Sequence, residues 1–152
     1  MTELSSRFAT ALSFAAELHR EHYRKGTDIP YVSHLLAVAS LALEHGADED
    51  EAIAAVLHDA QEDRGGTATT GVIEILFGAR VADIVRGCSD SEESVNKAPW
   101  KQRKDAYLAH LETATGSIRL VSACDKLHNA RAILADLRVM GTTCGRASAA
   151  GR

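Results

Sequence analysis

The sequence predicts an all-α domain, a bundle of about six to eight helices. Alanine and leucine, two strong helix formers, are abundant, and aromatic residues make up only 5% of the 152 residues. The two prolines, Pro30 and Pro99, both precede runs with helical spacing of apolar residues, where proline suits a first turn. No segment alternates apolar and polar residues over the length of a strand.

The first expected helix covers residues 5–23. Apolar side chains recur there at Phe8, Leu12 and Leu18, which places them on one helical face. The segment 24–30 that follows contains two cations, a glycine and a proline, and we interpret it as a loop.

The second and third helices are recognised by their ends. Pro30 suits the start of the second helix, and Gly46 suits its C-terminal cap. Asp48 with Glu51 three residues later has the pattern of a capping box, which opens a third helix running to about Asp59.

Four further helices are expected in the rest of the chain. They cover a short stretch capped by Thr69 or Thr70 that ends near 78, then 79–87, 99–113 and 117–139. We expect residues 1–140 to form one domain. The small and polar segment 141–152 predicts a short disordered tail.

The charge and cysteine content limit the partners and the compartment. A formal net charge of −4 gives no general attraction to nucleic acid. The three cysteines, Cys88, Cys124 and Cys144, are odd in number and form no CxxC pair, which favours the reducing cytoplasm. The N-terminus lacks a signal-peptide pattern, and no apolar run approaches 18 residues, so we expect no membrane partner.

His58 and Asp59 are the first candidate functional residues. Adjacent residues point about 100° apart on a regular helix, so these two side chains converge only where the helix ends. Glu62 and Asp63 follow closely, and acids packed beside an apolar helix repel one another unless a cation lies among them. A solvated acidic helix end is the alternative interpretation.

Two further polar residues lie in apolar helical segments. His34 alone would more often be a core histidine with a hydrogen-bond partner. Asp125 between apolar neighbours needs a cation or strong donors, because burial of an unpaired carboxylate is costly. Together with His58 and Asp59 they form a mixed nitrogen and oxygen set that suits Mn, Fe or Zn.

The order of these residues resembles that of the HD phosphohydrolase superfamily, H…HD…D. The string HDAQED at 58–63 and the string DKLHN at 125–129 are specific for it, together with residues 24–34. The resemblance is closest to the hydrolase domain of the RelA/SpoT alarmone enzymes and their small relatives, and it covers about residues 5–139.

This resemblance implies a metal-dependent hydrolase. It implies that Mn²⁺ activates a water that removes the 3′-pyrophosphate of (p)ppGpp, giving GDP or GTP. The implied metal ligands are the residues discussed above: His34, His58, Asp59 and Asp125. Glu62 and Asp63 match the acidic pair that positions and deprotonates the water.

The resemblance also implies nucleotide contacts. Arg24 and Lys25 match a basic pair near the base, and Asn129 matches a nucleoside contact. Lys97 and Lys101 belong to a basic segment that either binds the phosphates or forms a solvated helix face.

The chain departs from the family at particular positions. Ala132 stands where alarmone hydrolases often carry a hydroxyl that reads the base, and the loop before His34 is one residue longer. An HD phosphohydrolase of another nucleotide, such as a deoxynucleotide or a nicotinamide cofactor phosphate, therefore stays open, as does a non-catalytic regulatory module. Relatives often continue with another helix that packs on the domain, so we expect either an exposed apolar patch or a homodimer.

Overall fold

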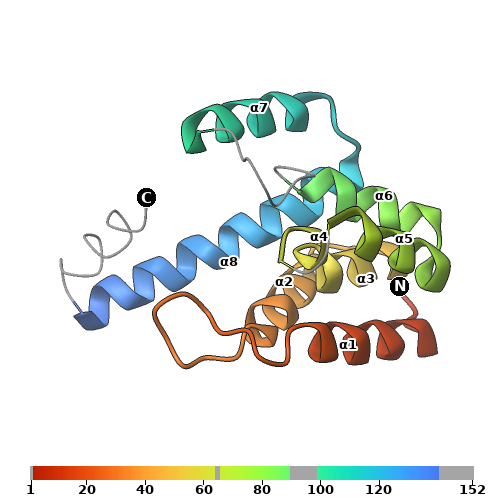
Figure 1. Cartoon of the computed structure of the whole chain (residues 1–152), viewed down its shortest axis with the longest axis horizontal. Coiled ribbons are helices and arrows are strands. Elements are labelled where there is room, and N and C mark those ends of the chain that lie inside the picture. Colours follow the sequence, from red (N-terminus) through yellow and green to blue (C-terminus); the bar gives the residue numbers. More distant parts are fainter. Residues whose placement is uncertain (1, 64–65, 90–98, 141–152) are drawn as a thin grey trace.

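The computed structural model describes residues 2–63, 66–89 and 99–140, and it is all-α over these ranges, as predicted (Figure 1). Its eight helices are α1 (Ser6–Leu18), α2 (Val32–Glu44), α3 (Glu49–Leu57), α4 (Ala60–Asp63), α5 (Gly66–Phe77), α6 (Ala79–Cys88), α7 (Trp100–Thr113) and α8 (Gly116–Met140). None of the helices within the described ranges is long and apolar enough to cross a membrane.

Helix α3 lies at the centre of the bundle. All residues from Ala52 to Leu57 are buried, so α3 beyond its acidic first turn is covered on every side, as expected for a segment that is apolar all round. It packs against α1, α2, α6 and α8, which surround it in Figure 1. The two residues that follow Leu57 are therefore carried into the interior of the domain.

Helix α1 ends at Leu18, so the prediction of a helix to residue 23 is wrong. The chain after α1 turns back on itself: the Arg24 amide donates to the Ile29 carbonyl at 2.9 Å, and the Tyr31 amide donates to the His22 carbonyl at 2.8 Å. These pairings across the loop replace the helical hydrogen bonds that the local sequence would otherwise form, and they position the start of α2.

The predicted capping box of α3 is present. The Asp48 side chain accepts from the Glu51 amide at 3.0 Å, and the Glu51 side chain accepts from the Asp48 amide at 2.9 Å. The predicted cap at Thr69 or Thr70 is wrong, because α5 already begins at Gly66. The buried hydroxyl of Thr70 instead donates to Gln61 Oε1 at 3.0 Å and ties α5 to α4.

The contact between Asp48 and Arg80 makes the stability of the fold depend on pH. Hydrogen bonds from Arg80 lower the pKa of the Asp48 carboxyl. The resulting stabilisation is present above the unfolded pKa of about 4 and is lost as pH falls through the lowered folded value. Asp48→Asn keeps the cap but removes the charge. We expect this variant to be less stable than the wild type at pH 7 in urea unfolding, with the difference vanishing in acid.

The matched control for this measurement is Asp83→Asn. Asp83 is exposed and pairs with Arg86 one turn away at 2.7 Å, a contact that contributes little. A difference between Asp48→Asn and the wild type that persists unchanged at low pH would contradict the role assigned to the Asp48 charge.

Helix α7 is set apart from the rest of the bundle (Figure 1). Of its fourteen residues, all of them described, Tyr107 alone is buried. The Tyr107 hydroxyl shares a hydrogen bond with Ser122 Oγ at 2.7 Å, and Lys126 Nζ lies 5.4 Å from the centre of the Tyr107 ring. The Tyr107 side chain thus links α7 to α8.

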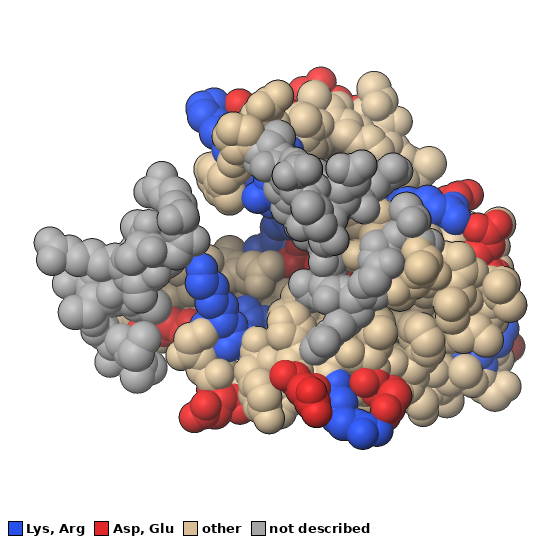
Figure 2. Space-filling view, in the orientation of Figure 1, with Lys and Arg blue, Asp and Glu red and all other residues tan. Residues whose placement is uncertain are grey.

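The surface carries charges of both signs, interspersed on the face shown in Figure 2 rather than gathered into one basic area. Apolar side chains are exposed along α8, where Leu127, Ile133 and Leu134 have relative exposures of 38%, 58% and 48%. An exposed apolar patch was one of the two alternatives expected from the sequence, without its position. The homodimer that would cover it stays a prediction.

Candidate metal centre

Four side chains from separate parts of the chain meet beside α3. His34 lies in the first turn of α2, His58 is the C-cap of α3, Asp59 separates α3 from α4, and Asp125 lies within α8. The break between α3 and α4 allows His58 and Asp59 to point to the same place, as the sequence predicted for a helix end. The helices that contribute these residues come together in the middle of Figure 1.

The ring nitrogens and carboxylate oxygens of this cluster lie close together. His58 Nε2 is 3.1 Å from Asp59 Oδ2 and 3.7 Å from Asp125 Oδ1. His34 Nε2 is 3.2 Å from Asp125 Oδ1 and 3.6 Å from Asp59 Oδ2. Ligand atoms of His34, His58 and Asp59 all fall within 4.8 Å of one another, so these three residues are placed to hold a metal ion.

The state of His58 provides a test of whether a cation fits. Its Nδ1 lies 2.8 Å from the Ala55 carbonyl oxygen, which can only accept, so Nδ1 carries the hydrogen. Its Nε2 is buried and has no hydrogen-bond partner among the described residues. Nε2 therefore faces two carboxylate oxygens, a position that positive charge, either a proton on Nε2 or a divalent cation, would stabilise.

The pKa shifts in the cluster arise from the close approach of the histidines and the carboxylates. Burial lowers the pKa of His58, but the negative charges of Asp59 and Asp125 outweigh it and raise the pKa well above its usual value. Burial raises the pKa of both carboxyls, but the neighbouring histidines shift them well below the usual range. Both carboxylates are thus ionised and require positive charge beside them.

A second layer of side chains orients the two carboxylates. The Tyr31 hydroxyl donates to Asp59 Oδ2. Asn129 Nδ2 donates to Asp125 Oδ1 at 2.6 Å, and Lys126 Nζ donates to Asp125 Oδ2 at 2.5 Å. The sequence reasoning assigned no role to Tyr31 or Lys126. The position of Tyr31 three residues before His34, on the same helical face, is a signal that could have indicated it.

Two of the predicted nucleotide contacts lie together next to the cluster. Arg24 Nη2 donates to Asn129 Oδ1 at 3.3 Å, which joins the loop after α1 to α8. Lys25 is exposed in the same loop. Lys101 lies on α7, where it pairs with Asp105 at 2.8 Å, and that contact does not connect it to the cluster. Lys97 lies outside the described residues.

The predicted acidic pair, Glu62 and Asp63, closes the short helix α4 just after Asp59. Their side chains lie outside the described part of the structure. The backbone places these two residues three and four positions after Asp59, in the helix that follows it.

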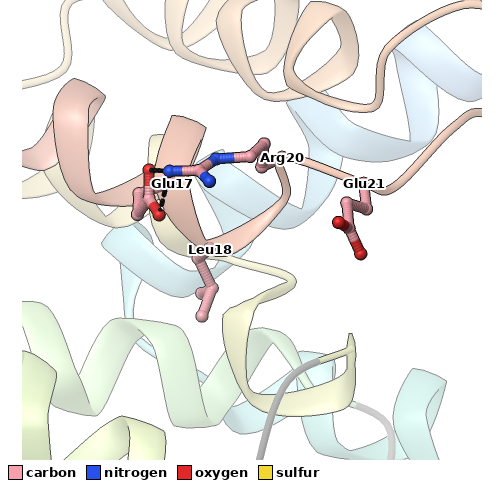
Figure 3. Close-up of a pocket in the computed structure, with 4 residues that line it drawn as sticks. All are labelled: Glu17, Leu18, Arg20 and Glu21. Carbon is pink, nitrogen blue, oxygen red and sulfur yellow. Dashed lines mark hydrogen bonds and ion pairs between the residues drawn. The ribbon is translucent and has the colours of Figure 1, made fainter.

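A hollow beside the end of α1 contains no comparable chemistry. It is lined by Glu17, Leu18, Arg20 and Glu21 (Figure 3). Arg20 Nη2 donates to both carboxylate oxygens of Glu17 at 2.5 Å, so the two charges compensate each other. We therefore take the histidine and aspartate cluster as the functional site.

An all-α bundle with a buried centre of two histidines and two aspartates defines a class of helical metal-binding domains. The model of the HD domain family matches residues 11–142, which is most of the chain. The chain therefore belongs to the HD domain family.

Similar proteins are named for one shared activity. The guanosine-3′,5′-bis(diphosphate) 3′-pyrophosphohydrolase of Xenopus tropicalis is 36% identical over 124 residues, which cover 80% of this chain and 66% of that protein. The bifunctional (p)ppGpp synthase/hydrolase SpoT of Escherichia coli is 31% identical over 133 residues, 84% of this chain and 18% of that protein. The chain thus spans slightly less than two thirds of the frog protein and under a fifth of the bacterial one.

Solved structures agree with the fold. A metazoan orthologue of SpoT, described as hydrolysing ppGpp, matches with a TM-score of 0.75 at 29% identity, over 91% of this chain and 74% of that chain. A protein from Listeria monocytogenes matches with a TM-score of 0.63 at 28% identity, over 72% of this chain and 67% of that one.

Proposed function

We propose that this protein is a manganese-dependent hydrolase that removes the 3′-pyrophosphate of (p)ppGpp. The balanced reaction is ppGpp plus water giving GDP plus pyrophosphate, or GTP from the pentaphosphate. The observation that carries the proposal is the buried His58 Nε2, which faces two carboxylates without a hydrogen-bond partner among the described residues. Relatives named for this activity support the choice of substrate. In this proposal the enzyme degrades the alarmone of the stringent response in the cytoplasm.

In this proposal, different residues of the chain would have different roles. His34, His58, Asp59 and Asp125 would hold the ion. A divalent cation there would lower the pKa of a water and offset negative charge on the phosphates. Glu62 and Asp63 would orient the attacking water and take its proton.

The substrate would lie between the cluster and the loop after α1. Arg24 presents a planar guanidinium that can stack on a base or donate two hydrogen bonds, and it already contacts Asn129. Lys25, Lys97 and Lys101 would add positive charge for the phosphates. A water that attacks phosphorus breaks the bond to the ribose 3′ oxygen, and the released pyrophosphate needs this charge compensation.

Arg24→Gln should weaken substrate binding more than it slows turnover. Loss of charge-assisted hydrogen bonds of about 1.5 kcal/mol would raise KM for ppGpp roughly tenfold. Steady-state kinetics would measure KM and kcat separately. Arg20→Gln, a nearby arginine paired with Glu17, is the matched control and should leave KM unchanged. An Arg24→Gln variant that keeps the wild-type KM would contradict the assignment of Arg24 as a nucleotide contact.

A second candidate is an HD phosphohydrolase of another nucleotide. Ala132 favours it, because alarmone hydrolases often carry a base-reading hydroxyl at that position. A deoxynucleotide or a nicotinamide cofactor phosphate would then be the substrate.

One experiment separates these possibilities. The purified chain is incubated with Mn²⁺ and ppGpp, and separately with deoxynucleotides, nucleoside monophosphates and nicotinamide cofactor phosphates, and every product is identified by chromatography. Pyrophosphate released from ppGpp supports the first proposal. Orthophosphate released from another nucleotide, with ppGpp intact, supports the second. No product at all, with no metal detected by elemental analysis, would contradict both and leave a non-catalytic module.

A further inference from the structure

A third histidine, His128, lies against the cluster from α8. Its Nδ1 is 2.7 Å from Nδ1 of His34, and the two ring centres are 4.9 Å apart at an interplanar angle of 42°. At this distance the two nitrogens share one hydrogen, so one ring donates and the other accepts. Which ring donates determines what the opposite nitrogen of His34 can do.

Arg24 settles the direction of this hydrogen bond. Its Nη1 lies 3.4 Å from the same Nδ1 of His128, and a guanidinium can only donate. The His128 Nδ1 therefore presents its lone pair, and the hydrogen belongs to Nδ1 of His34. The remaining nitrogen of His34, Nε2, then carries a lone pair that faces Asp125 Oδ1 at 3.2 Å.

We propose that His128 is a positioning residue that holds His34 in the Nδ1–H tautomer and so keeps Nε2 available to a metal ion. The inference rests on the metal centre of the proposed function. A histidine ligand of a metal commonly donates its other N–H to a carboxylate, a carbonyl or water, which fixes the ring. Here the acceptor is a second imidazole, and it comes from a residue 94 positions away.

His58 provides an internal comparison. The same tautomer is fixed there by the main chain, through the Ala55 carbonyl. No side-chain substitution removes that acceptor, whereas the acceptor of His34 belongs to a side chain. A change at His128 should therefore alter the tautomer of His34 and leave that of His58 as it is.

The first test is the tautomer itself. Long-range ¹H–¹⁵N spectra of the metal-free full chain, recorded at about pH 9, where ordinary imidazoles are neutral, distinguish Nδ1–H from Nε2–H rings. In the wild type we expect Nδ1–H for His34. In His128→Phe we expect His34 to gain the Nε2–H form, with His58 unchanged. A wild-type His34 in the Nε2–H form would overturn the proposal, even if no variant folds.

The second test is metal affinity, measured by titrating each protein with Mn²⁺ alone. Loss of an outer hydrogen-bond partner typically weakens metal binding 10- to 100-fold, so we expect a rise of about that size in the Kd of His128→Phe. His128→Asn, whose amide oxygen can accept, should recover most of the affinity. The control His110→Phe removes an exposed histidine that contacts the Gly87 carbonyl, and it should match the wild type.

The outcomes are distinguishable from a failure of the proposed function. If the wild type binds no Mn²⁺, the proposed function fails, while the spectra still decide which ring donates. If His128→Phe binds Mn²⁺ as tightly as the wild type, or if His128→Asn binds as weakly as His128→Phe, the positioning role is overturned although the metal centre stands.

Discussion

Asp125→Asn is expected to abolish metal-dependent hydrolysis while leaving the fold intact. The asparagine has nearly the same shape but lacks the charge that Asp125 Oδ1 presents to His34 and His58. A metal centre contributes several kcal/mol to catalysis, so kcat/KM should fall by at least about 100-fold. Added Mn²⁺ should also raise the Tm of the wild type but not of the variant, because only a protein that binds the ion is stabilised by it.

The matched control is Asp136→Asn, an exposed aspartate on the same helix. It should retain both the activity and the stabilisation by Mn²⁺. An Asp125→Asn protein that keeps near wild-type activity would contradict the assignment of Asp125 to the metal centre. An inactive Asp125→Asn protein with the same Mn²⁺ response as the wild type would show that the carboxylate acts in some other way.

Leu35→Ala is expected to have the largest effect on stability. Leu35 is fully buried on α2, the helix that carries His34 and packs against α3 and α8. Truncation of a buried leucine to alanine costs about 2–5 kcal/mol, through lost burial and the cavity left behind. For a chain of this size a loss of about 3 kcal/mol corresponds to a fall in Tm of roughly 6–12 °C, which thermal unfolding by circular dichroism would detect.

The neighbouring residue provides the control for this prediction. Leu36 is 48% exposed on the same helix, so Leu36→Ala should change stability by about 0.5 kcal/mol or less. Equal losses in the two variants would contradict the role assigned to the burial of Leu35 against α3 and α8.

Much of the fold was visible in the sequence because it depends on local patterns. The all-α class, the capping box at Asp48 and the end of α2 near Gly46 follow from propensity and from caps that involve neighbouring residues. The end of α1 was misplaced because it depends on hydrogen bonds between His22 and Tyr31, across a loop that the apolar spacing does not reveal.

For the site, too, some residues were predicted from the sequence and others were not. His34, His58, Asp59 and Asp125 were selected because polar residues inside apolar helices need partners, and the structure does bring the four together. The contact of His128 with His34 was not foreseeable, since it depends on how α8 crosses α2. The roles of all these residues stay predictions until binding and activity are measured.

The weak attachment of α7 has a consequence for motion. A helix with Tyr107 as its one buried residue can separate from the bundle without exposing the core around α3. Local opening of this kind requires less free energy than global unfolding, so the backbone amides of α7 should exchange with solvent deuterium well before those of α3. Because the ring of Tyr107 lies beside Lys126, which contacts Asp125, each such opening would also remove the ring from a cation next to the metal centre.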